Sequence, residues 1–261
     1  MTIDKRADII IEKPTAADLQ SLRALWAEVF GDGEEFLDSF FGIAFSTDRA
    51  MVARDTEGNI LSALYWLDCC LEEQRIAYIY GVGTAPSARG IGLCSRVMEA
   101  AHSALMKEGY SSAILVPVSR ALFGFYGRLG YKPCTEIRAL SALAEYPAQS
   151  VRQIDKAEYA ALRRKYIPTL GVLQEGVSLD FLGSQMLFFA GEGCVFTAYI
   201  KDNRLICPEL LGDTSRPGAI VSAMGCESGS FRLAGEGIPF TMIYPLSADA
   251  IIPGYFGLAF D

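Results

Sequence analysis

Residues 84–94 read Thr-Ala-Pro-Ser-Ala-Arg-Gly-Ile-Gly-Leu-Cys, and their pattern determines how the segments on either side are interpreted. A strand-like run, 76–82, precedes it, and a long helical pattern, 92–108, follows it. Two glycines let successive backbone N–H groups turn toward one point, and the start of a helix adds partial positive charge. The stretch therefore predicts a turn that holds a phosphate or diphosphate, to which Arg89 could add hydrogen bonds. A purely structural tight turn would use the same glycines.

The segments around this turn predict a mixed α/β fold. Apolar spacing of 3.6 residues or runs of β-branched and aromatic residues mark each element. The expected elements are a helix over 19–30, a hairpin of 51–54 and 60–70 around a Gly-Asn turn, a buried strand over 111–118 parallel to 76–82, a short helix capped by Ser119 and ended by Gly130, and a strand over 131–137.

The pattern breaks near residue 147, and we place a domain boundary there, between 1–146 and 147–261. The second half loosely repeats the first. A helical stretch, a strand-turn-strand, the strand 205–211 and an apolar stretch to Met224 follow one another as their counterparts do before Met98. We interpret this as an internal duplication; two unrelated α/β segments with common turn chemistry remain the alternative.

Charge and hydropathy exclude two classes of partner. The chain of 261 residues has 23 Lys and Arg against 31 Asp and Glu, and its net charge of −8 opposes a nucleic acid. The most apolar stretch, 182–200, is interrupted by Gln185, Glu192 and glycines, so it is not expected to span a membrane. The first eight residues carry acidic side chains and no long apolar run, and we expect a cytoplasmic protein.

Cysteine and histidine chemistry is not indicated. The seven cysteines form no CxxC pair, so neither a disulfide framework nor a metal site is expected. The single histidine, His102, lies eight residues after Cys94 on the expected helix, about 12 Å along its axis, too far for a catalytic pair. We expect His102 to be a solvated or capped helix histidine.

The glycine loop does not fit the nucleotide-binding patterns. No Lys-Ser or Lys-Thr follows it, as a P-loop requires, and the GxGxxG pattern fails because Pro86 stands at its third glycine. Arg89-Gly90-Ile91-Gly92-Leu93-Cys94 instead resembles the RxxGxG/A loop of the GCN5-related N-acetyltransferases, with Cys94 in place of the usual small residue. Downstream, 125–133 reads Phe-Tyr-Gly-Arg-Leu-Gly-Tyr-Lys-Pro and is similar to the FYxxLGFxP segment of that family.

The resemblance covers about residues 10–140 and implies a fold and a co-substrate. It implies a GNAT fold with splayed parallel strands, followed by a degenerate GNAT-like second domain in which 215–219 is a relic loop that binds no cofactor. Acetyl-CoA would lie with its diphosphate on the loop and its pantetheine arm along the strand. The residues expected to bind it are Gly81, Val82, Gly83, Thr84, Arg89, Gly90, Ile91, Gly92, Leu93, Cys94 and Ser119.

The resemblance also implies that Tyr126 donates a proton to the departing thiolate, although the helical spacing of Tyr126 with Leu122 and Leu129 would equally suit a core residue. No general base follows, because the strand position that often bears Glu in the family falls near Ile76 here. Water held by Tyr78 and Tyr80, the acids Glu72 and Glu73, and the terminal carboxylate of Asp261 are the candidates.

The sequence therefore predicts an N-acetyltransferase whose acceptor is a small-molecule or peptide amine, with no nucleic-acid or membrane partner. Aminoglycosides, polyamines, peptide amino-termini and lysine side chains stay open as acceptors, and an acidic protein favours a cationic one. A non-catalytic acyl-CoA-binding or regulatory module is the alternative, and a longer acyl-CoA donor is a third possibility. The oligomeric state is not indicated.

Overall fold

The computed structural model of the chain describes residues 9–260, in two compact units. Unit 1 comprises the chain up to Cys69, Gln74–Leu115 and Tyr244–Ala250; unit 2 comprises Cys70–Glu73, Val116–Ile243 and the chain from Ile251 onward. The expectations about the first eight residues and about Asp261 lie outside the described residues. The units divide the chain elsewhere than at residue 146, and the division into two family domains stays a prediction.

Unit 1 contains the elements expected before and after the glycine loop. The helix over 19–30, the hairpin, the strand before the loop and the helix after it are confirmed, with shifts of one or two residues at their ends. The elements are β1 (Ile10–Glu12), α1 (Leu19–Phe30), α2 (Glu34–Ser39), β2 (Ala50–Arg54), β3 (Ile60–Leu71), β4 (Gln74–Thr84), α3 (Leu93–Lys107) and β5 (Ser112–Leu115), with single turns at Ala16–Asp18, Phe40–Ala44, Thr47–Arg49 and Pro86–Ala88.

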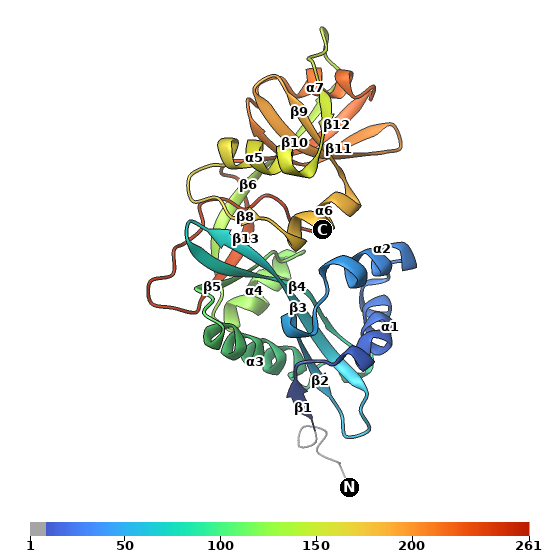
Figure 1. Cartoon of the computed structure of the whole chain (residues 1–261), viewed down its shortest axis with the longest axis vertical. Helices are drawn as coiled ribbons and strands as arrows, with labels where there is room; N and C mark the ends of the chain where they lie inside the picture. The colour runs from blue at the N-terminus through green and yellow to red at the C-terminus, as the bar shows by residue number, and fades with distance from the viewer. Residues whose placement is uncertain (1–8, 261) are drawn as a thin grey trace. The chain divides into compact units, whose positions relative to one another are not determined.

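The strands of unit 1 follow the spatial order β1-β2-β3-β4-β5. β1 pairs with β2 and β2 with β3 in antiparallel register, whereas β4 and β5 are parallel, as expected for strands joined by a helix. Figure 1 shows α1 and α2 on one side of β3 and β4, and α3 on the other side. Both faces of β4 are therefore covered, which explains why its central residues are almost all apolar.

A cluster of aromatic side chains fills the space between α1, α2 and the strands. Trp26 of α1 is buried, and its ring centroid lies 4.5 Å from that of Phe40, 5.4 Å from that of Tyr65 and 5.6 Å from that of Tyr80. One π-helical turn at Phe40–Ala44, closed by the N–H of Phe45 on the carbonyl of Phe40, continues α2 beside this cluster. Such turns are frequent at functional sites.

His102 corrects one expectation, because it is buried and not solvated. It lies on the buried face of α3, 5% exposed, and its ring is stacked on Tyr244 at a centroid distance of 4.0 Å. Burial lowers the pKa of His102 from 6.5 to about 4, since a charged imidazole would lose its hydration there. The apolar positions of α3 have the spacing that would have placed residue 102 on this face.

This pKa predicts a pH dependence of stability. In the unfolded chain His102 takes up a proton as the pH falls below 6.5, whereas in the folded protein it does so only near pH 4. The contribution of neutral His102 to the free energy of unfolding is therefore fully present above pH 6.5 and is lost as the pH falls from 6.5 to 4. At pH 5 the free energy of unfolding should be lower by about 2 kcal/mol. Urea unfolding at pH 7 and pH 5 measures this loss. His102→Phe, which keeps a ring for Tyr244, should remove it; equal pH dependence of both proteins would contradict the assignment.

Unit 2 contains the short helix expected after Ser119 and the elements of the second half. They are α4 (Arg120–Arg128), β6 (Lys132–Leu143), β7 (Arg152–Ile154), α5 (Lys156–Tyr166), β8 (Leu173–Gln174), α6 (Val177–Gln185), β9 (Leu187–Gly191), β10 (Cys194–Lys201), β11 (Arg204–Gly212), α7 (Pro217–Ala223), β12 (Ser228–Ala234) and β13 (Ile238–Pro245).

The strands of unit 2 follow the order β13-β6-β12-β11-β10-β9-β7 and carry one core on each face. On one face Ile220 and Val221 of α7 pack against buried residues such as Phe196 and Phe231. The other face of the sheet is covered by α5, α6 and the C-terminal segment 254–259. Its core includes Tyr159, Leu179, Leu182, Val195, Leu211, Tyr255 and Leu258.

The two units repeat one order of elements and one pattern of pairing. The order β1-α1-α2-β2-β3-β4-α3-β5 in unit 1 corresponds to β7-α5-α6-β9-β10-β11-α7-β12 in unit 2, which has one further short strand, β8, between α5 and α6. β1 and β2, like β7 and β9, are antiparallel, and the strands that flank the last helix, β4 with β5 and β11 with β12, are parallel in both. This correspondence favours the predicted internal duplication over two unrelated segments.

Within residues 9–260, no helix has both the length and the apolar character that crossing a membrane would require. All seven cysteines are free thiols.

Candidate active site

The glycine loop lies, as predicted, between the end of β4 at Thr84 and the start of α3 at Leu93. Gly90 and Gly92 have φ angles of +81° and +85°, in the left-handed region that favours glycine. A β-carbon built on either glycine meets no protein atom within 4 Å. Their conformation therefore requires glycine, while the space beside them is open to a ligand.

The start of α3 provides N–H donors next to these glycines. The first backbone hydrogen bond of the helix runs from the N–H of Arg96 to the carbonyl of Gly92, at 3.2 Å. The N–H groups of Leu93, Cys94 and Ser95 precede it and have no partner within the helix. A helix of 15 residues adds the positive end of its dipole at this point. The arrangement is that of an anion site at a helix N-terminus.

Cys94, the departure from the family loop, stands in the first turn of α3 and adds no charge there. Burial raises the pKa of the Cys94 thiol to about 11, so the group stays neutral at physiological pH. A neutral sulfhydryl does not repel a diphosphate, so the departure is compatible with the predicted role of the loop.

Arg89 braces the loop in this structure. Its guanidinium Nε donates to the carbonyl of Thr84 at 3.1 Å, which ties the loop back to the last residue of β4, and the residue is exposed. An exposed guanidinium beside the two glycines also adds positive charge to the loop.

The end of β4 leaves its parallel neighbour while it stays bound to β3. The pairing of β4 with β5 ends at Tyr78 and Ile114, although β4 continues to Thr84. On the β3 side, the hydroxyl of Ser62 donates to the carbonyl of Gly83 at 2.8 Å and lies 2.8 Å from the hydroxyl of Thr84. The two parallel strands are thus splayed after Tyr78, the form that the family resemblance predicts.

Gly81 and Gly83, both predicted to bind the co-substrate, also have a packing reason to be glycine. Gly81 has a φ of +59°, and a β-carbon on it would lie 2.4 Å from the ring of Trp26. A β-carbon on Gly83 would lie 3.3 Å from Val29 and from Phe30. These glycines let α1 approach β4 closely.

Ser119 and Tyr126 belong to unit 2, whereas the loop residues 81–94 belong to unit 1. Tyr126 is buried in α4, and its ring makes edge contacts with Phe125 at 5.2 Å and Tyr131 at 5.9 Å between centroids. Ser119 occupies the N-cap position of α4, as expected. Its side chain makes no capping hydrogen bond, so the expectation that its hydroxyl caps the helix is wrong. Their roles toward the co-substrate stay predictions.

The candidates for a general base have different surroundings. Ile76 is fully buried and Tyr78 is 3% exposed. Tyr80 is partly exposed and belongs to the aromatic cluster around Trp26. Glu72 and Glu73 form the turn between β3 and β4.

The aromatic cluster itself was missed by sequence reasoning. The sequence signal for this cluster is the close spacing of Phe36, Phe40, Phe41 and Phe45. These four residues do not all fall on one face of a regular α-helix, so helical periodicity does not reveal the cluster.

In unit 2 the loop that corresponds to the glycine loop is filled by the chain itself. A β-carbon on Gly218 would lie 2.6 Å from the carbonyl of Leu143 and 2.8 Å from Cβ of Glu145. Arg216 donates to the carbonyl of Pro147 at 2.8 Å. Segment 143–147 therefore fills the space beside Gly218 in unit 2. The corresponding space beside Gly92 in unit 1 is open.

Comparisons with known proteins agree with the fold. A family profile described as "Acetyltransferase (GNAT) domain" matches residues 11–134. Among solved structures, a GCN5-related N-acetyltransferase from Kribbella flavida is 16% identical, with a TM-score of 0.70 over 93% of this chain and 72% of the other. One from Anabaena variabilis is 13% identical, with a TM-score of 0.71 over 92% and 73%. At such identities these likenesses concern the fold. No curated protein matches significantly. Residues 11–134 thus match the acetyltransferase (GNAT) family model, and the chain shares the fold of solved GCN5-related N-acetyltransferases.

Proposed function

We propose that the chain transfers the acetyl group of acetyl-CoA to a primary amine. The observation that carries the proposal is the open loop of Gly90 and Gly92 at the start of α3, directly after a strand that has left its parallel partner. Backbone N–H groups of the loop and of the first helical turn bind the diphosphate. The edge of β4 from Ile79 to Thr84 offers main-chain groups to the amide-bearing pantetheine arm, as a sheet edge does to an added strand.

The reaction is a direct attack. A neutral amine adds to the thioester carbonyl, the C–S bond breaks, and the departing sulfur takes a proton from the hydroxyl of Tyr126, which regains one from solvent. The amine loses one proton to a base or to water, so the products are the N-acetyl amine and CoA. Tyr126 is the catalytic residue in this proposal.

Turnover of an amine panel is the direct test. Purified protein is incubated with acetyl-CoA and, in turn, an aminoglycoside, a polyamine, an amino-terminal peptide and a lysine peptide, and CoA release is followed as free thiol. Amine-dependent release supports the enzyme. Tight binding of acetyl-CoA without release on any amine favours the second candidate, a non-catalytic acyl-CoA-binding or regulatory module. A longer acyl-CoA in the same assay tests the donor, and the cytoplasmic location stays a prediction.

The loop assignment predicts different results for the two glycines that flank α3, Gly92 and Gly109. Gly92→Ala places a methyl group in the open space that the diphosphate must enter, and we expect the Kd for acetyl-CoA to rise about tenfold or more, or 1.4 kcal/mol. Gly109→Ala is the matched control: Gly109 has a φ of +77°, nothing within 4 Å of a built β-carbon, and lies at the other end of α3. Both variants carry the same backbone strain of about 1 kcal/mol. Equal affinities in the two variants would contradict the assigned site.

A further inference from the structure

Ser62 of β3 carries a fully buried hydroxyl next to the end of β4. Its neighbours along β3, Ala63 and Leu64, are buried and apolar. A hydroxyl in such a place is favourable only if its hydrogen bonds are made. Ser62 Oγ lies 2.8 Å from the carbonyl oxygen of Gly83 and 2.8 Å from the hydroxyl oxygen of Thr84. Both of its hydrogen bonds therefore go to the last residues of β4.

The direction of these two bonds follows from the number of hydrogens. A serine hydroxyl has one hydrogen to donate, and the carbonyl of Gly83 can only accept. The hydrogen of Ser62 is therefore used on Gly83, and the hydroxyl of Thr84 donates to Ser62 Oγ. Ser62 thus fixes one main-chain group and one side chain of β4 at the same time.

The hydrogen bonds at the end of β4 show which edge each residue faces. The carbonyl of Gly83 is bound from β3, and the N–H of Ala85 donates to the carbonyl of Leu61, also on the β3 side, at 2.8 Å. The carbonyl of Thr84, between them, accepts instead from Nε of Arg89 in the glycine loop, at 3.1 Å. Successive residues of a strand turn their main-chain groups to opposite edges, and residues 83–85 follow this rule.

The same alternation turns the N–H and carbonyl of Val82 to the edge opposite β3. In the described part of the chain, the pairing of β4 with β5 ends at Tyr78, before this residue. Val82 also stands between Gly81 and Gly83, and glycine restrains a backbone less than any other residue. The main-chain groups proposed to meet the pantetheine arm therefore lie in the least restrained stretch of β4, and the bonds of Ser62 restrain it.

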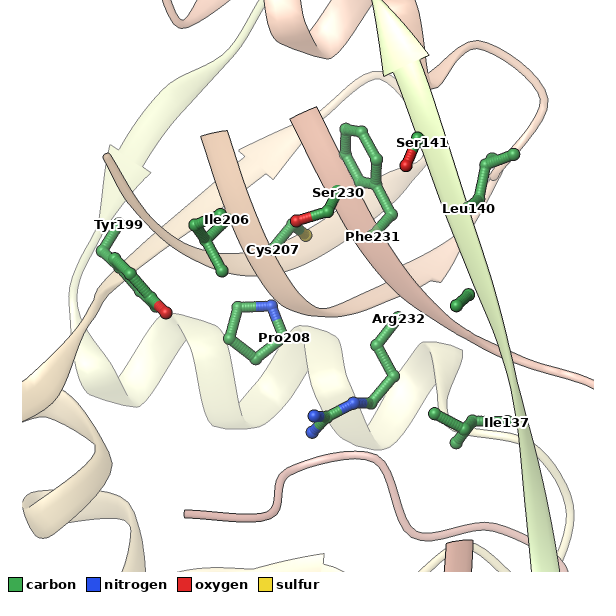
Figure 2. Close-up of a pocket in the computed structure, with 11 residues that line it drawn as sticks. Ile137, Leu140, Ser141, Tyr199, Ile206, Cys207, Pro208, Ser230, Phe231 and Arg232 are labelled. Atoms are coloured by element: carbon green, nitrogen blue, oxygen red, sulfur yellow. The ribbon is translucent and has the colours of Figure 1, made fainter. Parts of the chain in front are cut away.

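The corresponding strands of unit 2 differ in both respects. β11 and β12 are paired almost to the end of β11, where Leu210 lies opposite Leu233. Figure 2 shows part of this pairing, with Ile206 of β11 beside Ser230 of β12, where the strands line a pocket. On β10, the counterpart of β3, the buried hydroxyl of Thr197 has no hydrogen-bond partner among the described residues. A serine that holds a separated strand end thus occurs in the unit whose glycine loop is open.

We infer that Ser62 is a positioning residue for acetyl-CoA. It is buried under β4 and does not touch the co-substrate. It holds Gly83 and Thr84, so that the main chain of Val82 stays turned to the open edge where the pantetheine arm binds. The inference rests on the proposed use of acetyl-CoA. The two glycines of the loop fix their own backbone conformation, so Ser62 acts on the arm and not on the diphosphate.

Calorimetric titration of the full chain with two ligands tests this role. Acetyl-CoA carries the arm, and 3′-phosphoadenosine 5′-diphosphate is the part of the molecule that lacks it. Ser62→Ala should weaken acetyl-CoA by about tenfold or more and the armless ligand by less than about twofold, because only the arm needs the held edge. Ser62→Cys, which has a weaker donor in the same place, should give a smaller loss in the same direction.

Tryptophan fluorescence checks that each variant is folded, since Trp26 and Trp66 both lie in unit 1. Should Ser62→Ala fail to fold, Ser62→Cys carries the test with the same two ligands.

Ser112→Ala is the matched control. Ser112 is also fully buried, on β5 of the same unit, and its hydroxyl has no hydrogen-bond partner among the described residues. This variant should bind both ligands as the unaltered protein does. The inference is overturned if the Ser62 variants bind acetyl-CoA unchanged, if they lose both ligands equally, or if Ser112→Ala shows the same loss. Failure of the unaltered protein to bind acetyl-CoA would contradict the proposed function, and the inference with it.

Discussion

Tyr126→Phe is expected to lower kcat for acetyl transfer by about 100-fold or more and to leave the Kd for acetyl-CoA unchanged. The substitution removes only the hydroxyl that is proposed to protonate the departing sulfur, and the ring stays in its contacts with Phe125 and Tyr131. An interaction that acts only in the transition state appears in kcat and not in binding. Steady-state turnover and equilibrium titration of the two proteins measure this difference.

Tyr131→Phe is the matched control for this experiment. Tyr131 is also buried, its ring contacts that of Tyr126, and it stands where the family segment FYxxLGFxP has phenylalanine. Loss of its hydroxyl should leave kcat within about twofold, since no role in the transition state is assigned to it. Equal turnover of Tyr126→Phe and the unaltered enzyme would show Tyr126 to be a core aromatic only, as its helical spacing with Leu122 and Leu129 allowed.

The loop and its flanking elements could be predicted from the sequence because their determinants are local. Glycine at residues 90 and 92 follows from the backbone conformation of a turn into a helix, and the periodicity of α3 is visible in its own letters. Gly81 and Gly83 were identified as part of the same site, but their environment also depends on how closely α1 packs against β4. That distance is set by Trp26, Val29 and Phe30, which lie some 50 residues earlier in the chain.

Other features could not be predicted because tertiary partners decide them. The stacking of His102 on Tyr244 joins residues far apart in the sequence, and neither side chain alone indicates it. The end of the β4–β5 pairing at Tyr78 depends on β5 being short, whereas the apolar run 111–118 predicts a longer strand. The filling of the unit 2 loop by segment 143–147 requires the fold, since that segment reads as a linker.

The buried ion pair of unit 2 was likewise invisible in the sequence, and its removal should have the largest effect on stability. Glu209 of β11 is fully buried and accepts hydrogen bonds from Arg163 Nε at 2.8 Å and Nη2 at 3.0 Å, from the hydroxyl of Tyr159 at 2.9 Å and from that of Tyr255 at 3.1 Å. Arg163 also donates to the carbonyl of Val172 at 3.1 Å. One carboxylate thus joins α5, β11 and the C-terminal segment.

Arg163→Met should lower the free energy of unfolding of unit 2 by about 3–5 kcal/mol, because it leaves the Glu209 carboxylate buried without a cation. Arg164→Met, one residue along α5, removes only the pairing with Glu175, at a site where the Arg164 side chain is 54% exposed, and should cost less than about 1 kcal/mol. Both tryptophans, Trp26 and Trp66, lie in unit 1, so their fluorescence reports that unit alone. Hydrogen exchange of the β11 amides during urea titration follows unit 2.

A double variant of Arg163 and Glu209 tests whether the ion pair or the apolar packing stabilises this part of unit 2. In Arg163→Met with Glu209→Leu the unpaired carboxylate is gone, and two tyrosine hydroxyls lose their acceptor instead, at about 1–3 kcal/mol each. If the ion pair is the main constraint, the double variant should be more stable than Arg163→Met alone, since an unpaired buried charge costs more than an unmade neutral hydrogen bond. The double variant could instead lose as much free energy of unfolding as the two single variants lose together. That result would show that the two residues act independently, and it would contradict the role of the hydrogen-bond network in holding α5, β11 and the C-terminal segment together.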